Sequence, residues 1–97
     1  KNPTISKEQF QEVQIKYPEI PHYPSGDLVK VPAGWLIDQC GWKGKQIGNA
    51  GVHDKQALVL VNKGGATGAE IVHLAEQIQA SVKSKFGIEL RAEVNYI

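Results

Sequence analysis

The sequence predicts an α+β fold, a small single domain in which a mixed sheet packs against helices. The apolar run at 57–61 is typical of a strand covered on both faces. Between Thr67 and Gly87, apolar residues recur at three- and four-residue spacing, as they do along one face of a helix. Predicted helices and strands interleave without a strict βαβ rhythm, and 97 residues are enough for one domain.

The first predicted helix begins at Ser6, after an entering strand or extended lead over 1–5. Ser6 and Gln9 fit the S-x-x-Q pattern of a capping box, which satisfies backbone amides at a helix start. Pro18 ends this helix, because proline cannot continue the hydrogen-bond ladder.

A proline-rich segment separates this helix from the next one. Residues 18–27 contain three prolines and one glycine, so we expect no regular structure there. A short strand is predicted over 28–31. Pro32 suits the first turn of a second helix, and Gly41 suits its C-terminal stop.

The second half of the chain contains the clearest helix. A turn is predicted at 62–65, after the apolar strand. Thr67 and Glu70 then form a T-x-x-E capping box, and Gly87 ends the helix. Residues 88–96 alternate between apolar and polar, which predicts a final strand.

Composition and charge exclude several classes of protein. The net charge is +1, so a protein that coats nucleic acid is not expected. No apolar run approaches the roughly 20 residues of a membrane span. Cys40 is the single cysteine and the histidines are scattered, so we expect a reducing compartment, no disulfide and no metal site. Because the sequence opens at Lys1 and closes at Ile97 within a predicted strand, we expect a piece of a longer protein.

The stretch 41–56, GWKGKQIGNAGVHDKQ, is a candidate anion-binding loop. Its glycines fit neither of the common phosphate-loop patterns. They would still let backbone amides approach a phosphate closely, and Lys43 and Lys45 supply positive charge. The alternative interpretation is a solvated β-turn with a bulge.

Two further side chains are candidates for chemistry. Tyr23 lies in the stiff proline-rich segment, which suits ligand contact, and packing of the loop onto the domain explains it equally well. Glu93 lies on the polar face of the final strand, where the pattern alone indicates a solvated face. No nucleophile is paired with a base, so the residues by themselves predict no complete active site.

Four segments resemble a known family. They are KNP at 1–3, PHYP at 21–24, AGWLIDQCGWKGKQIGNAGVHDKQALVLVN at 33–62 and AEVNYI at 92–97. They are similar to the C-terminal substrate-binding domain of the UDP-N-acetylenolpyruvoylglucosamine reductases, also called UDP-N-acetylmuramate dehydrogenases. The resemblance implies that residues 1–97 are the substrate-binding domain of a cytoplasmic bacterial flavoenzyme whose own FAD-binding domains precede it.

The resemblance also implies a reaction in peptidoglycan precursor synthesis, and hence in cell wall biogenesis. In the family, NADPH reduces FAD, and the flavin passes hydride to the enolpyruvyl group of UDP-N-acetylglucosamine enolpyruvate. An enolate-like intermediate is then protonated to give UDP-N-acetylmuramate. The proton donor is a serine upstream of KNP, outside this chain. We therefore expect the chain alone to be inactive and to bind neither FAD nor NADPH.

Five residues take roles from this resemblance. Glu93 would stabilise or protonate the intermediate at the end of the substrate nearest the flavin. Asn2 and Gln56 would hydrogen-bond the diphosphate, Tyr23 would line the nucleotide channel, and Lys43 would contact phosphate or uridine. The alternative function is a stand-alone nucleotide-binding or protein-interaction module without catalysis.

Overall fold

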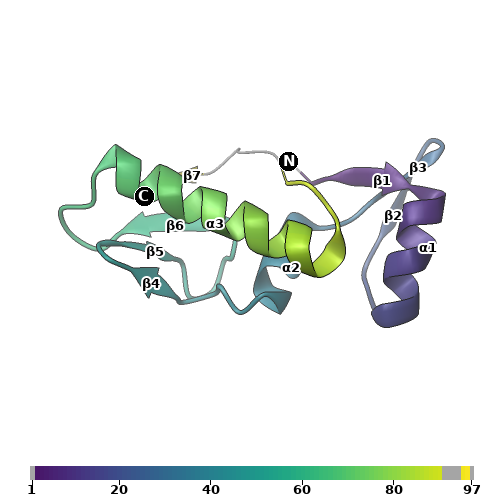
Figure 1. Cartoon of the computed structure of the whole chain (residues 1–97), viewed down its shortest axis with the longest axis horizontal. Helices are drawn as coiled ribbons and strands as arrows, with labels where there is room; N and C mark the ends of the chain where they lie inside the picture. Colours follow the sequence, from purple (N-terminus) through teal and green to yellow (C-terminus); the bar gives the residue numbers. More distant parts are fainter. Residues whose placement is uncertain (1, 91–94, 97) are drawn as a thin grey trace.

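In the described part of the chain, three helices and two small sheets form an elongated molecule with principal extents of 43, 22 and 21 Å (Figure 1). The computed structural model describes residues 2–90 and 95–96. In chain order the elements are β1 (Thr4–Ser6), α1 (Lys7–Lys16), β2 (Tyr23–Ser25), β3 (Leu28–Lys30), α2 (Ala33–Gln39), β4 (Gln46–Ile47), β5 (Ala50–Val52), β6 (Val59–Asn62), α3 (Gly68–Phe86) and β7 (Asn95–Tyr96). The predicted α+β class is confirmed.

One end of the molecule consists of α1 and a three-stranded antiparallel sheet in the order β1-β3-β2 (Figure 1). The prediction that residues 18–27 lack regular structure is wrong for Tyr23–Ser25, which form β2. Pro24 lies opposite Val29 in this strand. Because β2 is an edge strand, half of its N–H groups point away from the sheet, and a proline is tolerated there.

Helix α1 begins where the sequence predicts, but its capping box is only half formed. The Ser6 hydroxyl accepts a hydrogen bond from the Gln9 backbone N–H at 3.1 Å. The Gln9 side chain, however, donates to the Gly87 carbonyl at 2.9 Å. This bond ties α1 to the C-terminal end of α3, so a residue predicted to act as a local cap instead makes a long-range contact between two helices.

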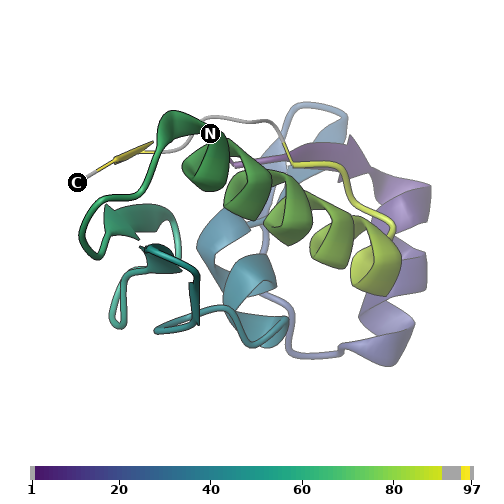
Figure 2. The same ribbon diagram turned by 60° about the vertical axis from the view of Figure 1, so that its left-hand side comes forward.

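The larger sheet has four strands in the order β4-β5-β6-β7 and is covered by α3 (Figure 2). The pairs β4–β5 and β5–β6 are antiparallel, whereas β6–β7 is parallel, so the sheet is mixed as predicted. The strand predicted at 57–61 forms at Val59–Asn62. The final strand was predicted over 88–96. It forms at Asn95–Tyr96, residues 88–90 are not a strand, and 91–94 lie outside the described residues.

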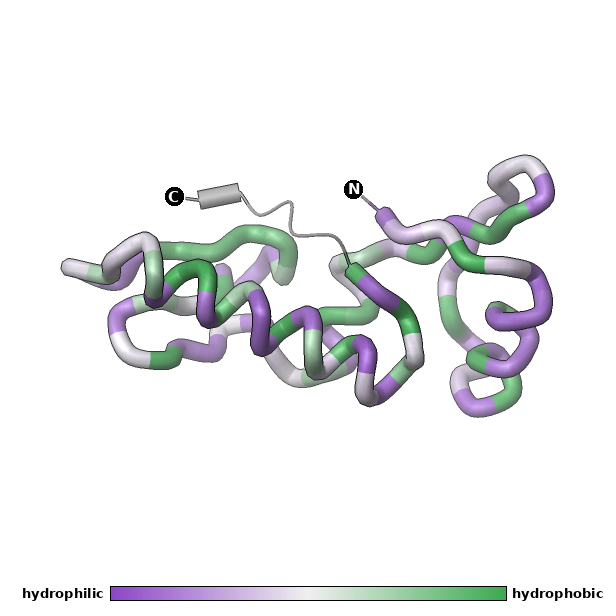
Figure 3. Tube along the Cα trace, turned by 45° about the horizontal axis from the view of Figure 1, so that its top comes forward, coloured by the Kyte–Doolittle hydropathy of each residue, from purple (hydrophilic) through white to green (hydrophobic). Residues whose placement is uncertain are grey.

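Helix α3 confirms both of its predicted ends. The Thr67 hydroxyl accepts from the Glu70 N–H, and the Glu70 carboxylate accepts from the Thr67 N–H, so the capping box is complete. Gly87 ends the helix with φ of +71°, a left-handed conformation that favours glycine. Hydrophilic and hydrophobic positions alternate along this helix (Figure 3), and its apolar side is buried against the core.

The core runs through both ends of the molecule. Its most deeply buried large side chains are Leu36, Leu60, Leu74 and Ile88. Among the described residues, no helix has the length and apolar character needed to cross a membrane. Within the same part of the chain, no three His, Cys, Asp or Glu side chains gather in a way that could hold a metal ion.

Candidate functional site

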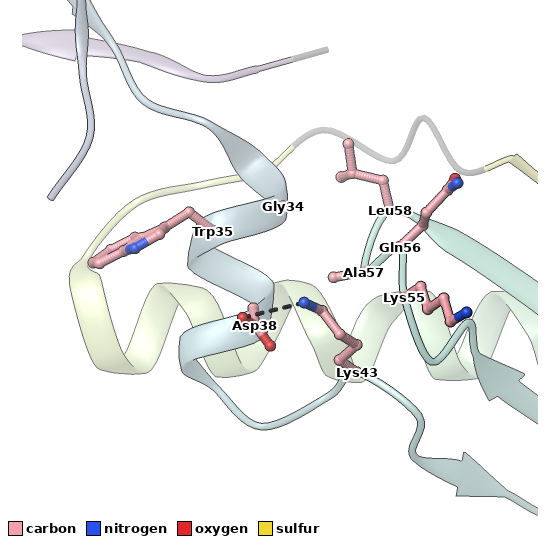
Figure 4. A pocket seen from close by; sticks show the side chains of 8 residues that line it. All are labelled: Gly34, Trp35, Asp38, Lys43, Lys55, Gln56, Ala57 and Leu58. Carbon is pink, nitrogen blue, oxygen red and sulfur yellow. Dashed lines mark ion pairs between the residues drawn. The ribbon is translucent and has the colours of Figure 1, made fainter.

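A hollow of about 370 Å³ lies between α2 and the segment that leads into β6 (Figure 4). We call it the α2 pocket. It is lined by Gly34, Trp35, Asp38, Lys43, Lys55, Gln56, Ala57 and Leu58. Its volume is near the lower end of the roughly 300–1,000 Å³ range of small-molecule sites.

Helix α2 forms one wall of this pocket, and Asn2 fixes where the helix starts. Pro32 occupies the N-cap position but offers no side-chain hydrogen bond. The Asn2 Oδ1 atom accepts from the Ala33 N–H at 2.9 Å, across a separation of 31 residues. Gly34 and Asp38 follow at a spacing of four and therefore share one face of the helix, toward the pocket.

The loop after α2 decides which lysine lines the pocket. Gly41 has φ of +78° and ends the helix as predicted, and Trp42 is only 6% exposed, which anchors the loop in the core. Lys43 lines the pocket, and its Nζ atom lies 3.4 Å from Asp38 Oδ2 (Figure 4). Lys45 instead lies over the Trp42 ring, with Nζ 4.8 Å from the ring centroid, a cation–π contact.

The stretch 41–56 is a β-hairpin whose two flanks border the pocket. Strands β4 and β5 meet at a two-residue turn in which Gly48 has φ of +60°, as the first position of a type II′ turn requires. Toward the open end of the hairpin, Val52 N–H donates to the Lys45 carbonyl at 2.8 Å and Gly44 N–H donates to the His53 carbonyl at 3.3 Å. The turn interpretation is therefore right for the tip, and the hairpin brings Lys43 and Gln56 to one pocket.

Lys55 and Gln56 border the pocket, and both of their side chains extend away from α2 (Figure 4). The His53 Nδ1 atom accepts from the Lys55 N–H at 3.0 Å, so Nδ1 carries no proton that it could donate to Asp54, 3.4 Å away. The closeness of His53 and Asp54 therefore follows from the local backbone of this segment, and their contact is not an ion pair. The Gln56 side chain makes no hydrogen bond to any described residue, and its amide points away from α2 (Figure 4).

The charges of the α2 pocket favour an anion. Among the described lining residues, Lys43 and Lys55 contribute two ammonium groups and Asp38 one carboxylate, which leaves one net positive charge. Apolar wall comes from Trp35 and from Leu58, which is 42% exposed. The sequence patterns did not single out Lys55 or Leu58. Only the adjacency of Lys55 to Gln56 could have pointed to it.

Asn2 and Tyr23, two other predicted site residues, are not among the residues that line the α2 pocket. Asn2 lines a larger groove of about 950 Å³, which also borders Lys30, Lys83 and Glu89. Tyr23 is 54% exposed on β2, where it lies opposite Lys30.

Glu93, the predicted catalytic residue, lies outside the described residues. Its role stays a prediction.

The groove carries one close ion pair. Lys83 Nζ lies 2.7 Å from Glu89 Oε1, and this hydrogen bond and the charge of Lys83 lower the pKa of the Glu89 carboxyl group. Lys83 also lies in the last turn of α3, where a cation is favoured by the helix dipole.

Comparison with known proteins identifies the family. The profile of the family described as "UDP-N-acetylenolpyruvoylglucosamine reductase, C-terminal domain" matches residues 1–97. The chain belongs to this family. Proteins named UDP-N-acetylenolpyruvoylglucosamine reductase are 58% identical to it over 97 residues in Bacteroides fragilis and in Porphyromonas gingivalis, and 57% identical over 94 residues in Burkholderia orbicola.

The chain accounts for the C-terminal domain of these reductases and for a minor part of their length. The matches cover 99% of the chain and 29% of the Bacteroides and Porphyromonas reductases, and 96% of the chain and 27% of the Burkholderia reductase. The resemblance inferred from the four sequence motifs is thereby confirmed at the level of the family.

Proposed function

We propose that residues 1–97 are the substrate-binding domain of a cytoplasmic bacterial enzyme that reduces UDP-N-acetylglucosamine enolpyruvate to UDP-N-acetylmuramate. The observation that carries this proposal is that Lys43 and Gln56, two residues expected to bind the UDP moiety, line one pocket. FAD, reduced by NADPH, would supply the hydride from the domains that precede this one. The α2 pocket is small for a dinucleotide, and the chain has no GxGxxG pattern, so we assign FAD and NADPH to those domains.

The polar groups of the pocket suit a diphosphate. Lys43 and Lys55 would neutralise phosphate charge. The amide of Gln56, which no described residue hydrogen-bonds, would donate to a phosphate oxygen. Each hydrogen bond to a charged oxygen contributes roughly 1.5–3 kcal/mol, so two or three of them suffice for micromolar affinity together with the apolar wall.

Asn2 can also donate a hydrogen bond to the diphosphate. Because its Oδ1 atom accepts from Ala33 N–H, its amide NH₂ group is left as a donor for the diphosphate. The exposed ring of Tyr23 would line the channel through which the nucleotide enters. Asn2 lines the groove, and Tyr23 lies opposite Lys30, another residue of the groove, so the proposed substrate would extend from the α2 pocket toward the groove.

A binding measurement tests the site. In the intact protein that carries this domain, isothermal titration with UDP should give affinities weakened about tenfold or more for Lys43→Met and for Gln56→Ala, since each removes one charge-assisted contact. Lys45→Met is the matched control, because Lys45 lies over Trp42, and it should bind UDP like the wild type. Equal binding by all variants would remove the α2 pocket from the substrate site.

A kinetic measurement tests the role of Glu93. In the intact enzyme, Glu93→Gln should slow oxidation of the reduced flavin by UDP-N-acetylglucosamine enolpyruvate about a hundredfold or more, as loss of a group that stabilises developing charge does. Reduction of the flavin by NADPH should be nearly unchanged. Unaltered substrate-driven oxidation would contradict the role of Glu93. An intact protein that binds UDP but carries no flavin would support the stand-alone module instead.

A further inference from the structure

Lys43 needs a partner if it is to bind an anion efficiently. Its backbone is fixed, because it follows the buried Trp42, but its side chain is a flexible stem of four carbons. A lysine that must be immobilised when the ligand arrives weakens binding, because its side-chain entropy is lost at that moment. A contact that already holds the ammonium group in the free protein reduces this loss.

Asp38 provides such a contact. Its Oδ2 atom lies 3.4 Å from Lys43 Nζ, and the two side chains are 43% and 36% exposed. Asp38 stands in the last turn of α2, on the face that carries Gly34. Among the described residues that line the α2 pocket, it is the only acidic one. Figure 4 shows the Lys43 side chain extended across the pocket toward this carboxylate.

We propose that Asp38 is a positioning residue, which holds the Lys43 ammonium group in place for a phosphate of the UDP moiety. The inference rests on the proposed function of the same pocket. Asp38 would make no contact with the ligand itself, and it would act through Lys43 alone.

Electrostatics alone predicts the opposite effect, which makes the inference testable. Replacing Asp38 by asparagine raises the net charge of the described lining residues from one to two positive charges. If the carboxylate only repels the ligand, Asp38→Asn binds UDP more tightly. If it positions Lys43, the variant binds UDP about three- to tenfold more weakly, the range expected for freeing one rotamer-rich side chain.

The experiment is a double-mutant cycle in the intact protein, with UDP as the titrant in calorimetry. We expect Asp38→Asn to weaken UDP binding in the wild-type background and to have no such effect in the Lys43→Met background. The same change should keep its full effect in the Lys45→Met background, which serves as the matched control. Asp38→Glu, which retains the carboxylate, should restore most of the affinity. An ion pair this exposed contributes little to stability, so the variants should melt close to the wild type.

A second measurement needs no variant. NMR relaxation of the lysine Cε–Nζ groups in the wild-type protein should show Lys43 more ordered than Lys55, for which the described residues offer no carboxylate partner. The inference is overturned if Asp38→Asn binds UDP as well as or better than the wild type, or if its effect persists without Lys43. If Lys43→Met weakens binding in the same series, the proposed function stands without the role of Asp38. If the wild type does not bind UDP at all, both fail.

Discussion

Asn2 has two roles in this account, and one pair of substitutions separates them. Its Oδ1 atom accepts from the Ala33 N–H at 2.9 Å and so caps α2, whereas its NH₂ group is proposed to donate to the diphosphate. Asn2→Ala removes both groups. Asn2→Asp keeps an acceptor at the helix start and removes the donor, and it brings a negative charge toward the ligand.

The magnitudes follow from the capping bond. Loss of an N-terminal cap costs about 0.5–2 kcal/mol, typically about 1. In a domain of this size, about 1 kcal/mol corresponds to a fall in Tm of roughly 4–8 °C, which is the change expected for Asn2→Ala. Asn2→Asp should melt at or slightly above the wild-type temperature, because an anion at a helix N-terminus contributes about 0.3–1 kcal/mol.

Two assays read the two roles. Circular dichroism of the 97-residue chain gives Tm, and calorimetry of the intact protein with UDP gives affinity. We expect both variants to bind UDP more weakly, but only Asn2→Ala to lose stability. If Asn2→Ala melts like the wild type, Asn2 does not hold α2. If Asn2→Asp binds UDP like the wild type, the Asn2 amide does not contact the diphosphate.

Three further predictions concern the scaffold. Thr67→Ala should lower the free energy of unfolding by about 1 kcal/mol in urea denaturation, since it breaks the capping box. Thr67→Ser keeps the hydroxyl and should not lower it. Equal losses in the two variants would rule out the hydroxyl as the cause. Leu36→Ala should lower the free energy of unfolding by about 2–5 kcal/mol, because Leu36 is 0% exposed and the change leaves a cavity. Leu36→Met should cost under about 1.5 kcal/mol. A smaller loss for alanine than for methionine would contradict this packing. Lys83→Met should raise the pKa of Glu89 toward its ordinary value in an NMR titration. Because the pKa of Glu89 is lowered in the folded state, the pair's contribution to folding stability is present above the unfolded pKa and is lost as pH falls through the folded pKa. An unchanged Glu89 titration in the variant would show that the pair is absent in solution.

Local signals made α3 fully predictable from the sequence. The capping contacts at both ends join residues that are close in the sequence: Thr67 with Glu70 at the start, and Gly87 with the last turn at the end. A pattern over neighbouring positions is therefore enough to place both ends of the helix. The apolar spacing between them then fixes which face is buried. The same local logic placed the start of α1 and the stop of α2.

Features that depend on distant partners could not be read in this way. The strand at Tyr23–Ser25 forms because it pairs with β3. The three prolines in residues 18–27 argued against a strand, so the sequence did not predict it. The cap on α2 comes from Asn2, 31 residues away. Lys43 and Lys45 look alike in the sequence. Only the burial of Trp42 and the position of Asp38 separate the lysine that lines the pocket from the one that lies over an aromatic ring.

Binding of the UDP moiety in the α2 pocket can be observed residue by residue with NMR chemical shifts. Signals of the intact protein would be followed during titration with UDP. We expect the side-chain amide signal of Gln56 and the ammonium signal of Lys43 to shift together, while the ammonium signal of Lys45 stays unchanged. Shifts confined to the far end of α3 around Lys83, with Gln56 and Lys43 unaffected, would contradict it.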